Sequence, residues 1–348
     1  MRRHTSLLAA VAAVGASAAM IGIGTASASA HAWHGRAPLP YQVFAPYFET
    51  YDTSGNLAAL SQQSGAKYLS LAFLETAQAG SCTAYWNGDT TEPIAYSSFG
   101  SDISQIQAAG GNVIPSFGGY TADTTDTDIA DSCSSVSAIA QVYESLITTY
   151  NVPRIDLDVE GDSLTNTAGI NRRNEAIAEV EAWAAAHHRR IQFSYTLPTF
   201  PTGLTSAGVA VLQNAVADGA TISVVNLLTF DYYLGTQQNM LTDTETAAAG
   251  LYSQLQSIYP TYTPRQLWHM IGVTEMPGID DYGPDETFST SQAWPLLKWA
   301  ESTGISTLSF WALQRDNGGC PGTKGAGTCS GVAQPIWFFS HVFEHFTR

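Results

Sequence analysis

The chain has 348 residues, of which 45% are apolar and 13% are charged. This composition excludes a disordered chain or a coiled coil, and it leaves enough apolar residues for the core of one large domain. Thirty acidic residues against fourteen basic ones give a net charge of −16. Because the acids are dispersed and no basic stripe exists, we expect neither nucleic-acid binding nor docking on a membrane surface.

The first thirty residues have the pattern of a secretory signal. Two arginines precede an apolar stretch over residues 7–23, and a small-x-small cleavage motif ends at Ala30. We predict a signal peptide over 1–30, a short polar leader over 31–40, and an extracellular mature protein. No later segment approaches eighteen uninterrupted apolar residues, so we predict no membrane span.

The four cysteines fit an exported protein with two disulfides. Cys320 and Cys329 bracket a glycine-rich stretch, so we predict that they pair locally, which leaves Cys82 to pair with Cys133. Zinc sites need closely spaced cysteine pairs, which this sequence lacks. We predict no metal ion and no cofactor.

Strand-like and helical patterns alternate along the chain. The β-rich runs cover 42–48, 68–74, 112–117, 154–159, 190–196, 222–230, 266–274 and 305–311, and the clearest helical patterns cover 134–150, 170–187, 206–218, 245–258 and 291–302. Eight strands that alternate with helices predict an α/β fold, a (β/α)8 TIM barrel formed as a single domain by residues 41–348. An open, doubly wound sheet is the alternative. A closed barrel needs no partner, so we expect a monomer.

The most informative segment is 154–161, with the sequence RIDLDVEG. Side chains of a strand alternate between its two faces, so Asp156, Asp158 and Glu160 share one face and the apolar residues between them share the other. In a barrel strand the apolar set faces the helices, so the three acids face the interior. Function in this fold lies where the strands end, which is where Glu160 falls.

Three carboxyls in a poorly solvated space cannot all ionise, so at least one is expected to be protonated near neutral pH. A carboxyl in that state can act as a general acid, and Glu160 is nearest the mouth of the barrel. A purely structural acid network that pairs with Arg154 and a Ca²⁺ or Mg²⁺ site are the alternatives. Strict alternation of three acids at a strand end favours catalysis.

Four segments in chain order resemble one enzyme family. Residues 153–160 (PRIDLDVE) resemble the DxxDxDxE motif of family-18 glycoside hydrolases, the chitinases, with Pro153 in place of the first Asp. Residues 116–119 are similar to the SxGG motif of that family, residues 228–232 to its sixth-strand motif, and residues 309–311 to its eighth strand. Several further segments resemble the bacterial chitinase D-type branch.

The resemblance implies a mechanism as well as a fold. Glu160 would protonate the glycosidic oxygen, and the 2-acetamido group of the substrate would attack the anomeric carbon to form an oxazolinium ion. Asp158 would accept the acetamido N–H, and Asp156 would modulate Asp158 through a shared proton. Such a mechanism requires an N-acetyl sugar, so chitin or a chitooligosaccharide is the implied substrate.

The resemblance also assigns the binding residues. Asp231 or Tyr232 would hold the acetamido group, because Phe230 replaces the tyrosine of the sixth-strand motif, and Trp311 would stack under the sugar ring. Other candidates for the lining of the groove lie near strand ends, although ordinary packing explains each of them alone: Tyr47, Ser116, Gly118 and Met276.

Two other functions fit the same scaffold. One is an endo-β-N-acetylglucosaminidase that acts on glycoprotein glycans. The other is a non-catalytic chitin-binding lectin, which the presence of Glu160 disfavours. Sequence alone decides neither endo against exo action nor processivity.

Two further motifs are interpreted as structural. Residues 341–345 spell HxxEH, a zinc-peptidase pattern, but they end three residues before the last residue, so we predict the final barrel helix there. Asp123, Asp126, Asp128 and Asp131 lack the glycine of a Ca²⁺-binding loop, so we predict a solvated loop.

Overall fold

Runs of aliphatic and β-branched residues form the predicted strands. The computed structural model describes residues 39–348, and the predicted signal peptide and most of the leader lie outside the described residues. The parallel strands are β1 (Val43–Phe44) with β2 (Tyr47–Glu49), β3 (Tyr68–Thr76), β5 (Asn112–Gly118), β6 (Arg154–Asp158), β7 (Gln192–Phe200), β9 (Ile222–Leu228), β10 (Ile271–Glu275) and β13 (Thr307–Phe310). Each pairs with the next in the order of the chain, as a barrel requires.

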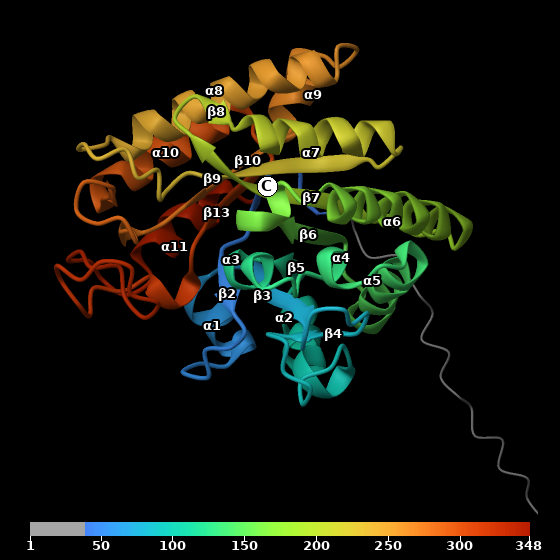
Figure 1. Cartoon of the computed structure of the whole chain (residues 1–348). Helices are drawn as coiled ribbons and strands as arrows, with labels where there is room; N and C mark the ends of the chain where they lie inside the picture. Colours follow the sequence, from blue (N-terminus) through green and yellow to red (C-terminus); the bar gives the residue numbers. More distant parts are fainter. Residues whose placement is uncertain (1–38) are drawn as a thin grey trace, which may run out of the picture. The chain divides into compact units, whose positions relative to one another are not determined.

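The first strand closes the barrel. Its first half, β1, pairs with β13, and its second half, β2, pairs with β3, so the two ends of the sheet meet in one segment. Between the halves, the Ala45 N–H donates to Leu308 (3.0 Å), and the carbonyl of Pro46 accepts from Ser70 (2.9 Å). The interruption falls at Pro46 because proline has no N–H to donate. The closed (β/α)8 barrel confirms the predicted fold class (Figure 1).

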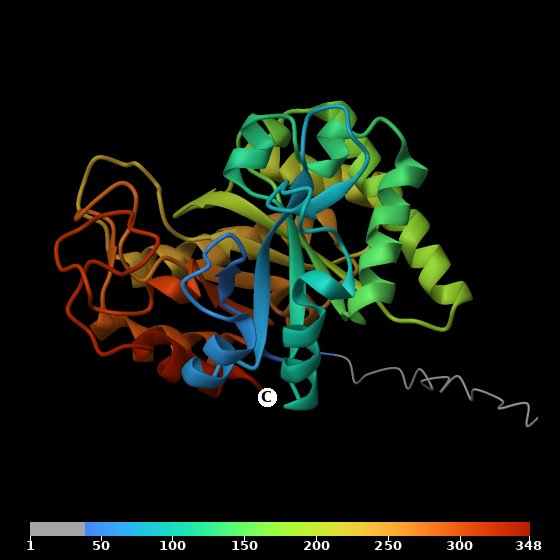
Figure 2. The same ribbon diagram turned by 90° about the horizontal axis from the view of Figure 1, so that it is seen from below.

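Helices surround the strands (Figures 1 and 2). The longer ones are α1 (Leu57–Ser64), α2 (Ser101–Ala108), α5 (Val136–Tyr150), α6 (Thr167–Ala186), α7 (Ser206–Ala217), α8 (Met240–Ile258) and α10 (Thr290–Thr303), followed by α11 (Phe338–Phe343). Side-chain oxygens of Ser135, Asn166 and Thr205 cap the N-termini of α5, α6 and α7. Such caps satisfy N–H groups that have no partner within the helix.

The seventh strand is shorter than predicted. The prediction started it at Gln266, but residues Pro264–His269 form the short helix α9, and β10 begins at Ile271. The Thr263 hydroxyl accepts from the N–H of Gln266, while the side chain of Gln266 accepts from the N–H of Thr263. This capping box, with Pro264 at the first helical position, starts a helix that the apolar pattern does not reveal.

Several short elements lie in the loops between the strands and the longer helices. They are α3 (Tyr120–Thr124), α4 (Ile129–Ser132), β4 (Ala84–Trp86), β8 (Gly203–Leu204), β11 (Gly278–Ile279), β12 (Thr287–Phe288), one π-helical turn (Tyr96–Gly100) and the 3₁₀ turns η2 (Gly161–Leu164), η3 (Leu313–Arg315) and η4 (Glu344–Phe346). Both predicted disulfides form, Cys82 with Cys133 and Cys320 with Cys329.

The C-terminal HxxEH segment is helical, as predicted. It spans the end of α11 and η4, where Phe343 and Phe346 are fully buried in the main core. His341 is exposed and lies 3.8 Å from Glu344 of the same turn.

Among residues 39–348, no helix is both long enough and apolar enough to cross a membrane.

Candidate active site

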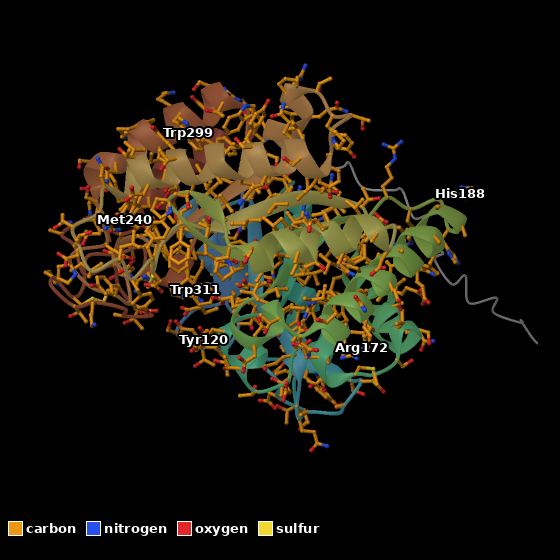
Figure 3. All side chains as sticks on the ribbon, turned by 45° about the horizontal axis from the view of Figure 1, so that its top comes forward. Tyr120, Arg172, His188, Met240, Trp299 and Trp311 are labelled. Carbon is orange, nitrogen blue, oxygen red and sulfur yellow. A yellow bond between two sulfur atoms is a disulfide. The ribbon has the colours of Figure 1, made fainter. Side chains whose placement is uncertain are left out.

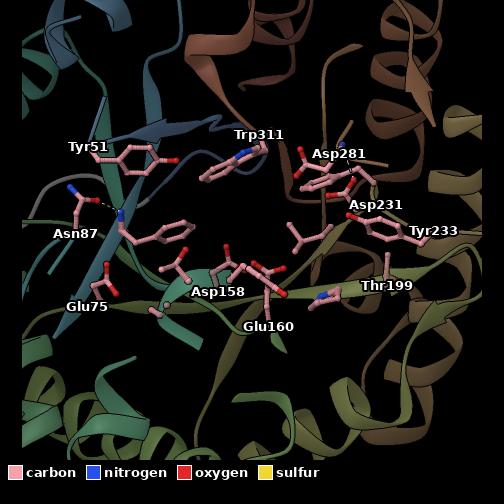
Figure 4. A pocket seen from close by; sticks show the side chains of 18 residues that line it. Tyr51, Glu75, Asn87, Asp158, Glu160, Thr199, Asp231, Tyr233, Asp281 and Trp311 are labelled. Atoms are coloured by element: carbon pink, nitrogen blue, oxygen red, sulfur yellow. Dashed lines mark hydrogen bonds between the residues drawn. The ribbon is translucent and has the colours of Figure 1, made fainter. Parts of the chain in front are cut away.

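A cavity of about 800 Å³ opens where the carboxyl ends of the strands meet the following loops. Asp158 and Glu160 lie in its middle (Figure 4). Tyr51, Glu75 and Asn87 line one side of it, and Asp231, Tyr233 and Asp281 line the other. Among residues 39–348, the lining combines aromatic rings with carboxyls and contains no lysine, arginine or histidine. This combination suits a ligand that is flat, polar and not anionic.

Strand β6 presents its acids to the barrel interior, as the alternation predicted. Asp156 is the deepest of them, and hydroxyls surround its carboxylate. Ser194 donates to Oδ1 (2.6 Å), while Ser116 (2.7 Å) and Tyr47 (2.9 Å) donate to Oδ2. Burial raises the pKa of Asp156, and these hydroxyl donors oppose the rise because they stabilise the ionised form.

Asp158 is equally buried but lacks such partners. Within the described part of the chain, its Oδ1 contacts no hydrogen-bond donor. Burial raises its pKa well above the usual range, and the charges of Glu160, Asp156 and Asp123 add to the rise. A buried carboxyl oxygen without a donor is costly, and Asp158 lines the cavity, where a bound ligand can supply a donor to its carboxyl.

Glu160 follows β6 at the floor of the cavity. Burial raises the pKa of its carboxyl to about 7, and the N–H of Tyr120 opposes part of that rise. The group is therefore largely protonated in mildly acidic solution and ionised in mildly alkaline solution. A carboxyl of this kind can donate a proton in one step and accept one in the next.

The acidic loop after β5 is not the solvated loop that we predicted. Asp123 and Asp128 are each 1% exposed. Of the four acids in this loop, Asp126 alone has an exposed side chain. Asp128 pairs with the buried Arg173 of α6 at 2.7 Å. The prediction failed because the spacing of the acids does not show that Arg173, about fifty residues later in the chain, packs against this loop and neutralises part of its charge.

Several predicted lining residues lie beneath the cavity instead. Tyr47 and Ser116 are fully buried and hold Asp156, so they support the acids rather than line the groove. Gly118 does line the cavity. Its φ of +93° and the backbone oxygen of Asp158, 2.1 Å from where a Cβ would be, leave room for glycine alone. Packing therefore explains the SxGG-like segment better than direct sugar contact does.

Trp311 forms the aromatic wall of the cavity. It follows β13, and its ring stacks on Phe73 with centroids 5.6 Å apart and planes 13° from parallel. Figure 3 shows Trp311 and Tyr120 on the same side of the barrel, and both line the cavity. The tryptophan thus lies where the resemblance predicted a sugar platform.

The segments after β9 and β10 each correct one prediction. Tyr232 is 3% exposed and does not line the cavity, whereas Tyr233 is 60% exposed and does. Asp231 and Tyr233 both have left-handed backbones, with φ of 51° and 56°, so the alternation of the strand ends at Asp231. Asp231 lines the cavity as predicted, but Met276 is buried outside the lining.

Buried carboxylates hold this loop in its unusual conformation. Asp280 accepts the N–H of Asp231 at 3.0 Å, and Glu286 accepts the N–H groups of Tyr232 (2.6 Å) and Leu234 (3.4 Å). Asp231, Asp280 and Glu286 bring ligand atoms within 4.8 Å of one another, as a cation site would. Their oxygens are already used by backbone N–H donors, so a structural role accounts for them.

Sequence reasoning missed three carboxyls. Glu75 and Asp281 line the cavity, and neither belongs to a motif that signals it. Glu275 ends β10 and is fully buried, with the Thr244 hydroxyl donating to it at 2.6 Å, and burial raises its pKa to about 8. A single acidic residue at the end of a strand could have indicated Glu275, but only the segment 154–160 carries several acids in alternation, which made its prediction possible.

Comparison with known proteins gives consistent results. The chain is 31% identical over 321 residues to the "Probable bifunctional chitinase/lysozyme" of Escherichia coli K12, and 31% identical over 288 residues to "Endochitinase 11" of Metarhizium anisopliae. These alignments cover 89% and 80% of this chain but only 35% and 53% of the relatives. The catalytic domain of the hyperthermophilic chitinase of Pyrococcus furiosus matches with a TM-score of 0.76 at 29% identity, covering 90% of this chain and 97% of that one. No family model matches the chain.

The cavity lies at the carboxyl end of a (β/α)8 barrel, with buried carboxyl groups at its floor and aromatic rings in its wall. This arrangement is that of the glycoside hydrolases. The similarity to chitinases extends over most of the described residues and includes the strand that carries the acids. In sequence and in fold the chain is similar to chitinases, and these comparisons support a family-18 chitinase.

Proposed function

We propose that the protein is a chitinase that cleaves β-1,4-linked N-acetylglucosamine chains with retention of configuration. The observation that carries the proposal is the pair formed by Asp158 and Glu160. One offers a buried carboxyl oxygen that lacks a donor, and the other has a pKa of about 7. The relatives named as chitinases support the choice of substrate.

The reaction then proceeds in two steps. In the first, Glu160 gives its proton to the glycosidic oxygen while the bond from that oxygen to C1 breaks. The acetamido carbonyl oxygen of the same sugar forms a bond to C1 and yields an oxazolinium ion. In the second, water attacks C1, its proton goes to Glu160, and the bond from C1 to the acetamido oxygen breaks. Two inversions at C1 give net retention.

Asp158 assists by accepting the acetamido N–H through its free oxygen, which aligns the carbonyl oxygen with C1 and stabilises the positive charge. Asp156 adds negative charge behind Asp158. The described residues contain no hydrogen bond between these two carboxyls, so the effect of Asp156 is electrostatic rather than a shared proton. Stacking on Trp311 orients the sugar, and a preset orientation accelerates an intramolecular attack.

Two amide substitutions test the assignment. Glu160→Gln and Asp158→Asn each keep the size of the side chain but remove its acid–base chemistry or charge. We expect Glu160→Gln to abolish product release from chitohexaose while it still binds the sugar, and Asp158→Asn to lose most of the activity. Asp162→Asn is the matched control, because Asp162 is exposed two residues from Glu160.

Unchanged hydrolysis by Glu160→Gln would remove this residue from the mechanism. A high-mannose glycopeptide assayed beside chitohexaose distinguishes the chitinase from an endo-β-N-acetylglucosaminidase. Binding of chitohexaose without any cleavage by the wild-type protein would instead indicate a lectin.

We also propose that the protein is exported. The pattern of residues 1–30 and the two disulfides of the barrel support this, since disulfides persist in oxidising compartments. Sequencing of the N-terminus of protein recovered from the culture medium would test it. A new N-terminus at His31 is expected, and retention of Met1 on protein that stays in the cell would contradict export.

A further inference from the structure

The backbone of Glu160 is held by a side chain from another barrel loop. Asp123 of α3 accepts the N–H of Glu160 at its Oδ2 (2.5 Å) and the hydroxyl of Ser163 at its Oδ1 (2.9 Å). These two donors lie on either side of Gly161, which turns the chain with a φ of +43°. One buried carboxylate therefore clamps the turn that immediately follows the catalytic strand.

A second layer fixes Asp123 itself. Asp131 of α4 lies against the same Ser163 hydroxyl, which has one proton and so donates to one of the two acids while it accepts from the other, protonated one. Asp131 also accepts from Asn166 at 3.0 Å. Arg173 of α6 is fully buried and lies 2.7 Å from Asp128 and 3.8 Å from Asp131. Arg172 of α6 contacts the same segment, since its Nε donates to the carbonyl of Ala130 at 2.8 Å.

Charged groups surround Asp123 on two sides, in the outer layer and in the active site. The ionisable groups that act on Asp123 are Asp128 and Arg173 from the outer layer and Asp158 from β6, while Glu160 contacts it through its backbone N–H. Asp131 lies beyond Ser163. Two cations oppose these acids: Arg173 pairs with Asp128 and also lowers the pKa of Asp123, and Arg172 acts on Asp131. Burial raises the pKa of Asp123 itself well above its usual range, and in its ionised form Asp123 raises the pKa of Asp158.

We infer that Asp123 is a positioning residue for Glu160, which fixes the backbone of the acid and contributes to the electrostatic field at Asp158. The inference rests on the proposed function and deepens it. A proton donor must be aligned with the glycosidic oxygen, and a misplacement of about 1 Å lowers the rate by about 100-fold. Asp123 does not touch substrate, so its loss acts on turnover rather than on binding.

Two substitutions at one position separate positioning from mere stability. Asp123→Ala removes the acceptor, so we expect kcat on chitohexaose to fall about 10- to 100-fold while KM changes by less than about threefold. Asp123→Asn keeps an oxygen that can accept from Glu160, so most of kcat should return. It also removes the negative charge, so the acid limb of its pH profile should move to lower pH. Asp126→Asn, an exposed acid in the same loop, is the control.

The outcomes distinguish this inference from the function on which it rests. A folded Asp123→Ala variant with wild-type kcat, while Glu160→Gln is inactive, overturns the inference alone. Equal losses of kcat in the alanine and asparagine variants also overturn it. Should Asp123→Ala fail to fold, the asparagine variant decides: an acid limb at lower pH supports the inference, and an unmoved limb overturns it. A wild-type protein that hydrolyses no chitooligosaccharide refutes both.

Discussion

In the proposed mechanism, the pKa of Glu160 sets the pH above which activity is lost. A glutamate in water has a pKa of 4.5, and burial raises that of Glu160 to about 7. At pH 6 the buried carboxyl is roughly 90% protonated, whereas an exposed one would be roughly 3% protonated, a ratio of about 30 in competent enzyme. We therefore expect kcat/KM on chitopentaose to be half-maximal near pH 7 and to fall about tenfold per pH unit above it.

The assay follows the initial rate of chitopentaose cleavage by chromatography between pH 4 and pH 9. A chitobioside with a nitrophenyl leaving group serves as the matched comparison, because that leaving group needs little protonation and should weaken the alkaline limb. Half-maximal kcat/KM at pH 4.5 to 5 for chitopentaose would refute the reasoning, since it would mean that burial does not keep Glu160 protonated. An identical limb for both substrates would show that the limb belongs to another group.

Two further predictions concern buried carboxyls around the site. Burial raises the pKa of Glu275 from 4.5 to about 8, so its stabilising effect is complete below pH 4.5 and declines as pH rises to 8. Glu275→Gln should thus be more stable than wild type at pH 8, by up to about 4 kcal/mol, and similar at pH 4.5, as urea unfolding would show; equal stability at both pH values would contradict this. Glu286→Ala should raise KM about tenfold, because the left-handed turn that presents Asp231 and Tyr233 loses two acceptors. Glu286→Gln should raise it less, and an unchanged KM in both variants would argue against the role of the turn.

The sequence predicts the parts of this molecule that follow a period. The alternation of apolar and acidic residues in 154–160 placed all three acids correctly, because a strand has only two faces. The same rule failed after β9, where Asp231 adopts a left-handed backbone and Tyr233 rather than Tyr232 enters the cavity. Such a turn is fixed by distant carboxylates, which no local pattern shows.

Contacts between loops were the other part that sequence could not provide. Asp123 and Arg173 are fifty residues apart and belong to different loops and helices, so their burial depends on how successive βα units pack. The disulfides were predictable because four cysteines allow few pairings and a glycine-rich loop favours a local one. Glu75 and Asp281 show the limit, since a single acid at a strand end or in a loop carries no distinctive signal.

The role of the substrate's acetamido group can be measured directly. The rate of hydrolysis of chitopentaose is compared with that of its fully deacetylated counterpart and of cellopentaose, at equal occupancy of the site. Cleavage of chitopentaose alone, with the β-anomer formed first, is the predicted result. Comparable cleavage of either chain that lacks the acetamido group would contradict the assistance assigned to Asp158, whatever the activity of the Glu160 variant.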